Sequence, residues 1–298
     1  MHTPASSMPM SIGFIGGSLN SAVGYTHFVA SSMDNKWILN AGCFSTNTQR
    51  NRESAQAYGV ASDRVYDDWQ GMIEKEKERL DAIVIMTPTP AHFEIVITCL
   101  KEDIPVICEK SLATSSSDSE KILEVRNLKK GFLAVTYNYS GYPMVRELKK
   151  LIQKGNLGKI QHFQVEMPQE GYLRVDAQGN KPIPQLWRLS DGQVPIIHLD
   201  LGSHLHHLIH YLVGQKPLDV IADQNSYGWF PGVIDNVTCL CRYSDNIQGQ
   251  MWFSKSALGH RNGLRLRIYG SKGSAEWYQA CPEELIMAFA DGKRMILD

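Results

Sequence analysis

Residues 198–214 read HLDLGSHLHHLIHYLVG, a segment in which five histidines accompany one aspartate. Asp200 and His204 are four residues apart, so on an α-helix their side chains share one face. An imidazole beside a carboxylate is suited to act as a general base that is held in position. We therefore predict that Asp200 and His204 are catalytic. The alternative is a hydrogen-bonded aspartate at a helix start, beside a histidine that only packs.

Histidines also bind metal ions, which requires ligands that converge. At about 100° per residue the five histidines point in different directions, and only His206 and His210 have the i, i+4 spacing of two ligands on one helix. No clear third ligand accompanies that pair, so we expect no metal. A separate stripe on the same helix is expected to face the core and comprises Leu201, Leu205, Leu208 and Leu212.

A second reactive group lies in IPVICEKSLATS, where Glu109 and Lys110 directly follow an apolar run that is typical of a buried strand. Open α/β sheets bind their ligands at the carboxyl ends of the strands. A lysine ammonium there can donate to a substrate hydroxyl and stabilise the negative charge that develops on its oxygen. We predict that Lys110 is catalytic. The alternative is a solvent-exposed lysine in a strand-to-helix loop.

A glycine-rich turn ends the first apolar run, in IGFIGGSLNSAVG, and a helix is expected to begin near Ser21. The backbone N–H groups of such a helix start bind a pyrophosphate when small residues let the backbone come close. Counted from Gly16, serines replace the second and third glycines of the GxGxxG pattern, so a tight turn without a ligand is the alternative. The residues predicted to contact the dinucleotide are Gly16, Gly17, Ser18, Leu19 and Asn20.

The second apolar run ends in CFSTNTQRNRE, which has no acidic residue before Glu53 to bind the ribose hydroxyls of NAD. Ser45 and Arg50 are available instead. They favour or at least tolerate a 2′-phosphate, so the cofactor is NAD or NADP and the segment favours NADP. The alternative is that the arginines only form a solvated first helical turn.

Positioning these groups requires a parallel sheet. Short apolar runs at 11–15, 38–44, 82–86, 105–108 and 133–138 alternate with helix-length segments at 51–58, 92–101 and 117–129. This alternation predicts an α/β fold, a Rossmann-type doubly wound parallel sheet over residues 1–140. From residue 141 a helix at 144–154 and longer alternating stretches predict an α+β domain, residues 141–298, with an open and mostly antiparallel sheet.

The composition of the 298 residues excludes other classes of protein. Thirty basic and 31 acidic residues give a net charge of −1, which argues against a nucleic-acid surface or a polybasic membrane anchor. The apolar runs are far shorter than the ~20 residues that span a bilayer, and no export signal precedes them. Six cysteines without a CxxC pair suggest buried, reduced thiols. We expect a cytoplasmic protein that binds neither nucleic acid nor membrane.

Taken in order, the motifs resemble the glucose-fructose oxidoreductase / inositol dehydrogenase / MocA family over essentially the whole chain. They are IGFIGGS with His27 downstream, TPTPAH, CEKSLA where the family has EKP, GYPMVRELKKLIQKGNLGKI, DLGSH matching D-x-G-x-H, and LRLRIYGSKGSAEW. Two features depart from the pattern. Ser111 replaces the proline of EKP, and the chain stops where relatives commonly continue.

The resemblance implies a nicotinamide-dependent dehydrogenase that acts on a sugar, a sugar derivative or a cyclitol and forms homo-oligomers through the open sheet. The lysine of EKP matches Lys110, and the aspartate and histidine of D-x-G-x-H match Asp200 and His204. Residues matched to the cofactor side are Thr87, Pro88, His92, Glu109 and Lys110. Residues expected on the substrate side are Tyr139, Trp187, Arg188 and His207.

The expected reaction uses His204 as the base, Asp200 to hold the imidazole and Lys110 to stabilise the developing oxyanion. Folding must then bring Lys110 and His204 to one small alcohol. Two alternatives remain at this point. One is a redox-neutral glycosidase or epimerase that uses the bound cofactor transiently, and the other is a non-catalytic nucleotide sensor.

Overall fold

The computed structural model describes residues 8–298, so the first seven residues of the predicted N-terminal domain lie outside it. The chain folds as two compact units, which we call the first unit (up to Thr136) and the second unit (from Tyr137 on). The boundary predicted after residue 140 lies in the short 3-10 turn Asn138–Gly141, at the start of the second unit. Each unit is described by itself below.

The first unit is a five-stranded parallel sheet in the order β2-β1-β3-β4-β5. Its strands are β1 Met10–Gly16, β2 Trp37–Cys43, β3 Ala82–Met86, β4 Val106–Glu109 and β5 Leu133–Thr136. Its helices are α1 Gly24–Ser32, α2 Thr48–Tyr58, α3 Trp69–Glu76, α4 His92–Lys101 and α5 Ser116–Lys129. The predicted doubly wound α/β sheet is confirmed.

Helices cover both faces of this sheet because alternate strand residues point to opposite sides. Ile12 and Phe14 of β1 belong to a core that includes residues of α2 and is packed by Phe28 of α1. Ile15 of the same strand belongs to a second core, to which α3, α4 and α5 contribute. Strands that are buried on both faces therefore appear in the sequence as short, continuous apolar runs.

Two helices of the first unit differ from the prediction. Helix α1 begins at Gly24 and not near Ser21, because residues 18–21 form a turn that the Ser21 N–H closes by donating to the Ser18 carbonyl at 2.7 Å. Helix α3 was not predicted. Its sequence WQGMIEKE has only a short apolar stripe, and its start is fixed by the Asp68 side chain, which accepts from the Gly71 N–H at 2.7 Å.

The second unit is an eight-stranded sheet in the order β13-β12-β11-β10-β6-β9-β8-β7. Its strands are β6 Ile160–Pro168, β7 Asp219–Asn225, β8 Asn236–Arg242, β9 Gln248–Ser254, β10 Arg265–Gly270, β11 Gly273–Tyr278, β12 Leu285–Phe289 and β13 Arg294–Leu297. Every neighbouring pair is antiparallel except β6 and β9. The predicted mostly antiparallel sheet is confirmed. The short strands β12 and β13 were not predicted.

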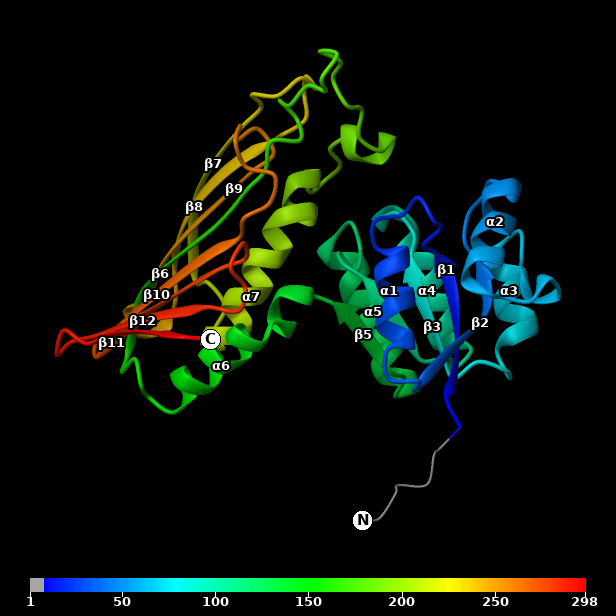
Figure 1. Cartoon of the computed structure of the whole chain (residues 1–298), viewed down its shortest axis with the longest axis horizontal. Helices are drawn as coiled ribbons and strands as arrows, with labels where there is room; N and C mark the ends of the chain where they lie inside the picture. Colours follow the sequence, from blue (N-terminus) through cyan, green and yellow to red (C-terminus); the bar gives the residue numbers. More distant parts are fainter. Residues whose placement is uncertain (1–7) are drawn as a thin grey trace. The chain divides into compact units, whose positions relative to one another are not determined.

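Helices α6 Pro143–Gln153 and α7 Ser203–Val213 lie along one face of the eight-stranded sheet, and no helix of the described residues covers the other face (Figure 1). The covered face forms the core with the four leucines of the predicted stripe, which are all buried; Leu205, Leu208 and Leu212 lie on α7, and Leu201 lies just before it. The prediction that Asp200 and His204 lie on one regular α-helix is wrong. Residues His198–Gly202 form a π-helical turn, so Asp200 does not lie on a regular α-helix.

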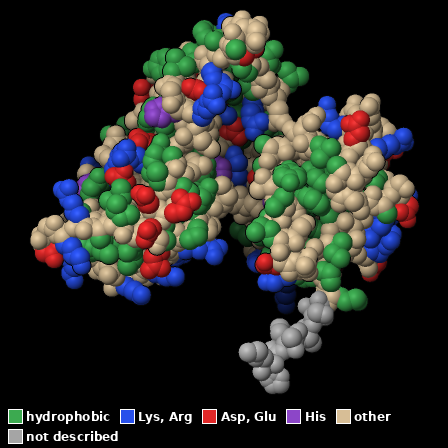
Figure 2. Space-filling view, viewed as in Figure 1, with side chains coloured by type: hydrophobic (Ala, Val, Ile, Leu, Met, Phe, Trp, Pro, Cys, Tyr) green, Lys and Arg blue, Asp and Glu red, His purple; other side chains and the backbone are tan. Residues whose placement is uncertain are grey.

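The structure also bears on three expectations from the composition, which concern charge, cysteines and membrane spans. Acidic and basic side chains are interspersed on the visible surface of each unit (Figure 2). Five of the six cysteines are buried as expected, but Cys281 is exposed. Among the helices of residues 8–298, none has the length and apolar character needed to cross a membrane.

Candidate functional site

The glycine turn lies at the carboxyl end of β1, beside β3. Because α1 follows β1 on one face and α4 follows β3 on the other, this is the switch point at which open parallel sheets bind ligands. Gly16 has a φ of +82°, and a Cβ there would lie 2.7 Å from the carbonyl carbon of Met86. Only glycine fits this position. The turn therefore has the close backbone approach that a dinucleotide site requires.

Gly24, which the sequence analysis did not select, completes this turn. A Cβ on Gly24 would lie 2.2 Å from the carbonyl oxygen of Gly17, so the start of α1 packs directly on the turn. The Gly24 N–H donates to the Ser21 hydroxyl at 3.3 Å. Gly24 thus supplies the close packing of helix on strand that the last glycine of GxGxxG provides in dinucleotide sites. Its spacing of eight from Gly16 hides it from that pattern.

Helix α2 holds the turn from the other side. The Tyr58 hydroxyl donates to the Gly17 carbonyl at 3.1 Å, and the Leu19 N–H donates to the Ser54 hydroxyl at 3.2 Å. The backbone of the turn is therefore fixed by side chains of a neighbouring element. A pyrophosphate bound there would meet preorganised donors.

The predicted ribose segment leads into α2. The Ser45 hydroxyl accepts from the Asn47 N–H at 3.1 Å, and the Asn47 side chain caps the helix by accepting from the Arg50 N–H at 2.9 Å. Arg50 itself is exposed in the first helical turn. These residues follow β2, so they lie at the same edge of the sheet as the glycine turn.

His92 joins the two loops that follow β3 and β4. It is 1% exposed, and its Nε2 and Nδ1 lie 2.8 Å from the carbonyl oxygens of Thr87 and Ser111. Burial lowers the pKa of His92, an effect larger than that of the two carbonyls, which favour the protonated ring. His92 therefore ties together the loops that carry Pro88 and Lys110.

Glu109 lies at the end of β4, immediately before Lys110. Its Oε1 is 2.7 Å from Nε2 of His27, and its Oε2 accepts from the Lys110 N–H at 3.3 Å. Burial would raise the pKa of Glu109, but hydrogen bonding, foremost from His27, and the charge of Lys110 together lower it. Glu109 is therefore a half-buried carboxylate that holds the backbone from which Lys110 projects. The peptide bond between Lys110 and Ser111 is cis.

In the second unit, Asp200 lies between two cations. Its Oδ2 accepts from Nζ of Lys255 at 2.5 Å and from Nε of Arg188 at 2.9 Å. Asp200 and Lys255 are both buried. Arg188 was predicted from the sequence. Lys255 was not, because it follows β9 in a segment without a recognisable motif. A buried carboxylate with two cationic partners is stable as the charged form.

His204 is surrounded by aromatic rings. It is buried, with the ring of Tyr139 edge-on at 4.8 Å and that of Tyr137 edge-on at 5.8 Å between centroids. Tyr137 also stacks on His207 at 4.2 Å, and burial lowers the pKa of His207. Tyr137 was missed because it lies in no motif. The predicted residues Tyr139, His204 and His207 thus form one cluster.

Trp187 and Arg188 lie together in the 3-10 turn Leu186–Leu189. The guanidinium of Arg188 lies 4.4 Å from the centre of the Trp187 ring, and the indole N–H of Trp187 donates to the Gln185 side chain at 2.9 Å. Both residues are partly exposed. Through Arg188 this turn is bonded to Asp200, so the predicted residues of the second unit are connected to each other.

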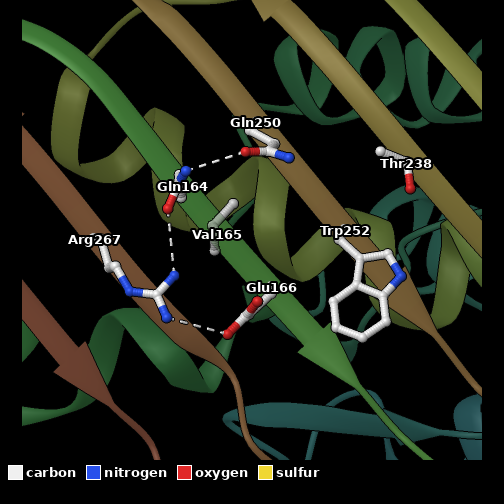
Figure 3. Close-up of a pocket in the computed structure, with 7 residues that line it drawn as sticks. All are labelled: Gln164, Val165, Glu166, Thr238, Gln250, Trp252 and Arg267. Carbon is white, nitrogen blue, oxygen red and sulfur yellow. Dashed lines mark hydrogen bonds and ion pairs between the residues drawn. The ribbon is translucent and has the colours of Figure 1, made fainter. Parts of the chain in front are cut away.

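The open face of the second sheet carries a separate concavity of about 410 Å³ (Figure 3). Its polar side chains bond to each other: Gln164 donates to Gln250 at 3.2 Å, and Arg267 pairs with Glu166 at 3.5 Å. The remaining lining residues are Val165, Thr238 and Trp252. Core residues of these strands pack against α7 on the covered face. The concavity therefore lies on the opposite face of the sheet from His204.

Within residues 8–298, no group of three or more histidine, cysteine or acidic side chains is arranged to hold a metal ion. His206 and His210, the pair with ligand spacing, have nearly parallel rings with centroids 6.4 Å apart.

Comparison with known proteins assigns both units to one family. Residues 10–137 match the family described as "Oxidoreductase family, NAD-binding Rossmann fold", and residues 145–276 match the "GFO/IDH/MocA C-terminal domain". The chain is 30% identical over 287 residues to the uncharacterized oxidoreductase YfiI of Bacillus subtilis, which spans 94% of this chain and 73% of that protein.

Two further relatives are known by an activity or by bound ligands. Levoglucosan dehydrogenase of Pseudarthrobacter phenanthrenivorans is 25% identical over 268 residues, 82% of this chain and 66% of that protein. The crystal structure of an inositol dehydrogenase homolog from Azotobacter vinelandii, complexed with NADH and myo-inositol, matches with a TM-score of 0.89 and 26% identity over 98% of this chain and 76% of that chain. With a glycine turn at the switch point of its parallel sheet, the chain belongs to the glucose-fructose oxidoreductase / inositol dehydrogenase / MocA family of oxidoreductases, whose N-terminal domain is an NAD-binding Rossmann fold.

Proposed function

We propose that this chain is a nicotinamide-dependent dehydrogenase that oxidises a hydroxyl carbon of a sugar, a sugar derivative or a cyclitol. The observation that carries the proposal is that Asp200 and His204 are both buried in the second unit of an oxidoreductase whose first unit has an NAD-binding fold. The relatives support the substrate class, because one is named for levoglucosan and another was solved with NADH and myo-inositol.

In the proposed reaction, His204 takes the proton of the substrate hydroxyl and Asp200 holds the imidazole. Lys110 stabilises the charge that develops on the substrate oxygen. A nicotinamide cofactor held by the first unit would supply the hydride acceptor, so the alcohol would lose its hydroxyl proton to His204 and a hydride from the hydroxyl-bearing carbon, and would become a carbonyl. Acid–base assistance of this kind contributes about 10²- to 10⁴-fold to the rate. The proposal requires Lys110 and His204 to reach one substrate oxygen.

The dinucleotide would be held by the first unit. We propose that residues 16–20 contact the pyrophosphate, and that Thr87, Pro88, Glu109 and Lys110 lie on the nicotinamide side, with His92 as their support. Positive φ at Gly16 and Gly17 and the packing of Gly24 on the turn support this proposal, because a backbone without side chains lets a phosphate come close.

For the ribose we propose a preference for NADP. The support is the absence of an acidic residue between β2 and Glu53, together with exposed Arg50 in the first turn of α2. Dissociation constants for NAD and NADP, measured on the wild type and on Arg50→Ala, test this preference. We expect the variant to lose NADP affinity and to keep NAD affinity; a clear NAD preference of the wild type would contradict the proposal.

On the substrate side we propose Tyr139, Trp187, Arg188 and His207 as contacts. Tyr139 packs on His204 and Arg188 bonds to Asp200, while Trp187 packs on Arg188 and His207 stacks on Tyr137. We further propose that the uncovered face of the second sheet contacts another copy of the chain.

We also propose a reducing, cytoplasmic location, which the six free cysteines support.

The deciding experiment incubates the purified chain with NAD or NADP and a panel of myo-inositol, levoglucosan and D-glucose. A dehydrogenase accumulates reduced nicotinamide, which is read from its ultraviolet absorbance. A redox-neutral glycosidase or epimerase converts the substrate without that signal, and a sensor binds cofactor without turning over any member of the panel. Either result in place of reduced cofactor would contradict the proposal.

A further inference from the structure

Lys255 is a buried lysine in direct contact with Asp200. It directly follows β9, is 8% exposed and places Nζ 2.5 Å from Asp200 Oδ2. Its backbone is fixed on both sides, because its N–H donates to the Asp235 carbonyl at 2.7 Å and its carbonyl accepts from the Tyr172 N–H at 2.8 Å. The sheet end therefore holds this ammonium in place.

The second cation on Asp200, Arg188, is more exposed than Lys255, although its guanidinium bonds to both oxygens of the carboxylate. Arg188 donates to the same Oδ2 at 2.9 Å, but its side chain is 29% exposed and projects from the short 3-10 turn Leu186–Leu189. The side chain of Lys255 is only 10% exposed. Lys255 is therefore the buried cation on Asp200, and Arg188 is the one that solvent reaches.

Charge explains why a lysine is present at this buried position. An ammonium loses its hydration on burial, which is unfavourable unless a carboxylate pairs with it. Burial lowers the pKa of Lys255, and the neighbouring Asp200 opposes that effect. The pairing keeps Asp200 as a carboxylate in one orientation. A fixed carboxylate is what orients a catalytic imidazole and stabilises it when it takes up a proton.

We propose that Lys255 is a positioning residue for the dehydrogenase reaction, which holds Asp200 in the orientation from which this carboxylate supports His204. The inference rests on the proposed function and deepens it. Lys255 acts through Asp200 and does not contact the substrate. Its removal should therefore affect the chemical step and not the binding of cofactor.

The test compares Lys255→Met, Lys255→Arg, Asp200→Asn and the double variant Asp200→Asn/Lys255→Met in the full chain. Lys272→Met is the matched control, because Lys272 is exposed in the same unit. Urea unfolding first establishes that each variant is folded. Cofactor affinity, kcat and KM are then measured with the member of the sugar and cyclitol panel that the wild type oxidises.

We expect Lys255→Met to lower kcat by about 10- to 100-fold, as removal of a residue that supports a reactive group typically does. Cofactor affinity should stay within about twofold of the wild type, and Lys255→Arg, which keeps the charge, should recover part of kcat. In the Asp200→Asn background, adding Lys255→Met should change kcat by less than about twofold, because the lysine then has no carboxylate to orient.

Three outcomes would overturn the inference. A folded Lys255→Met with the kcat of the wild type excludes a positioning role and leaves the proposed function intact. Losses that multiply in the double variant show that Lys255 acts independently of Asp200. If the wild type binds cofactor but oxidises no member of the panel, the proposed function itself fails, and the role of Lys255 fails with it.

Discussion

His27 of α1 and Glu109 at the end of β4 are joined by a hydrogen bond of 2.7 Å, although 82 residues separate them in the chain. Their side chains are 18% and 16% exposed. Because an ionised carboxylate only accepts, Nε2 of His27 must carry the donated proton. This contact links the helix that starts at the glycine turn to the residue that precedes Lys110.

Replacing His27 with alanine should destabilise the first unit. The change leaves a half-buried carboxylate oxygen of Glu109 without its donor, which costs about 1.5–3 kcal/mol. His27→Gln, whose amide can donate to the same oxygen, should lose less. Urea unfolding at neutral pH measures both variants, and an alanine variant as stable as the wild type would show that the hydrogen bond contributes nothing.

The stability contributed by Glu109 should depend on pH. Its pKa is lower in the folded chain than the ordinary value of about 4.3, so the contribution is fully present above that value and is lost as pH falls through the folded pKa. Wild type should therefore be more stable than Glu109→Gln at neutral pH, and the difference should shrink in acid. Unfolding curves at several pH values check this. A constant difference would contradict it.

Lys110→Met should abolish most turnover without affecting cofactor affinity. If the ammonium stabilises the developing oxyanion, its loss should lower kcat by about 10²-fold or more. Lys101→Met is the control, because Lys101 is exposed at the end of α4 and has no place in the proposed reaction. Near-normal turnover of the Lys110 variant would show that the assigned role is wrong.

Gly16→Ala should weaken cofactor binding, whereas Gly59→Ala should not. Both glycines have positive φ, so alanine costs about 1–2 kcal/mol at either position. A Cβ on Gly16 also meets the Met86 backbone, whereas one on Gly59 meets open space. We expect a loss of cofactor affinity of about tenfold or more only for Gly16→Ala, which corresponds to about 1.4 kcal/mol. Equal affinities of the two variants would refute a cofactor site at this turn.

A thiol reagent should modify Cys281 rapidly in the folded chain and the other five cysteines slowly. Cys281 is exposed, while burial raises the pKa of Cys43 to about 11 and that of Cys99 to about 12, so that little thiolate is present. Cys281→Ser should remove the rapid reaction, and denaturation should expose all remaining thiols. Rapid reaction of several thiols in the native chain would contradict the burial.

The architecture was predictable because its signals are local. Each of the five strands of the first unit coincides with an apolar run, and helix α4 has the predicted bounds His92–Lys101. Where the local signal is weak, the prediction fails. No strand was predicted after residue 279, so β12 and β13 were missed, and α3 depends on a cap at Asp68 and on packing against the sheet.

The site was predictable in part for the same reason. The order of the motifs along the chain is enough to select residues 16–20, Lys110, Asp200 and His204 as candidates. The π-helical turn at His198–Gly202 was not predicted. Over five residues, the pattern of apolar positions does not distinguish a π-helical turn from a regular α-helix.

By itself, the sequence determined the two kinds of sheet, the family and the principal reactive groups, because periodicity and motif order are properties of neighbouring residues. The tertiary structure alone decided which side chains hold those groups. Lys255 bonds to Asp200 although 55 residues separate them in the chain. Gly24, at the start of α1, packs directly on the backbone of Gly17. Such contacts depend on how strands and helices pack in space, and no local pattern of residues encodes that packing.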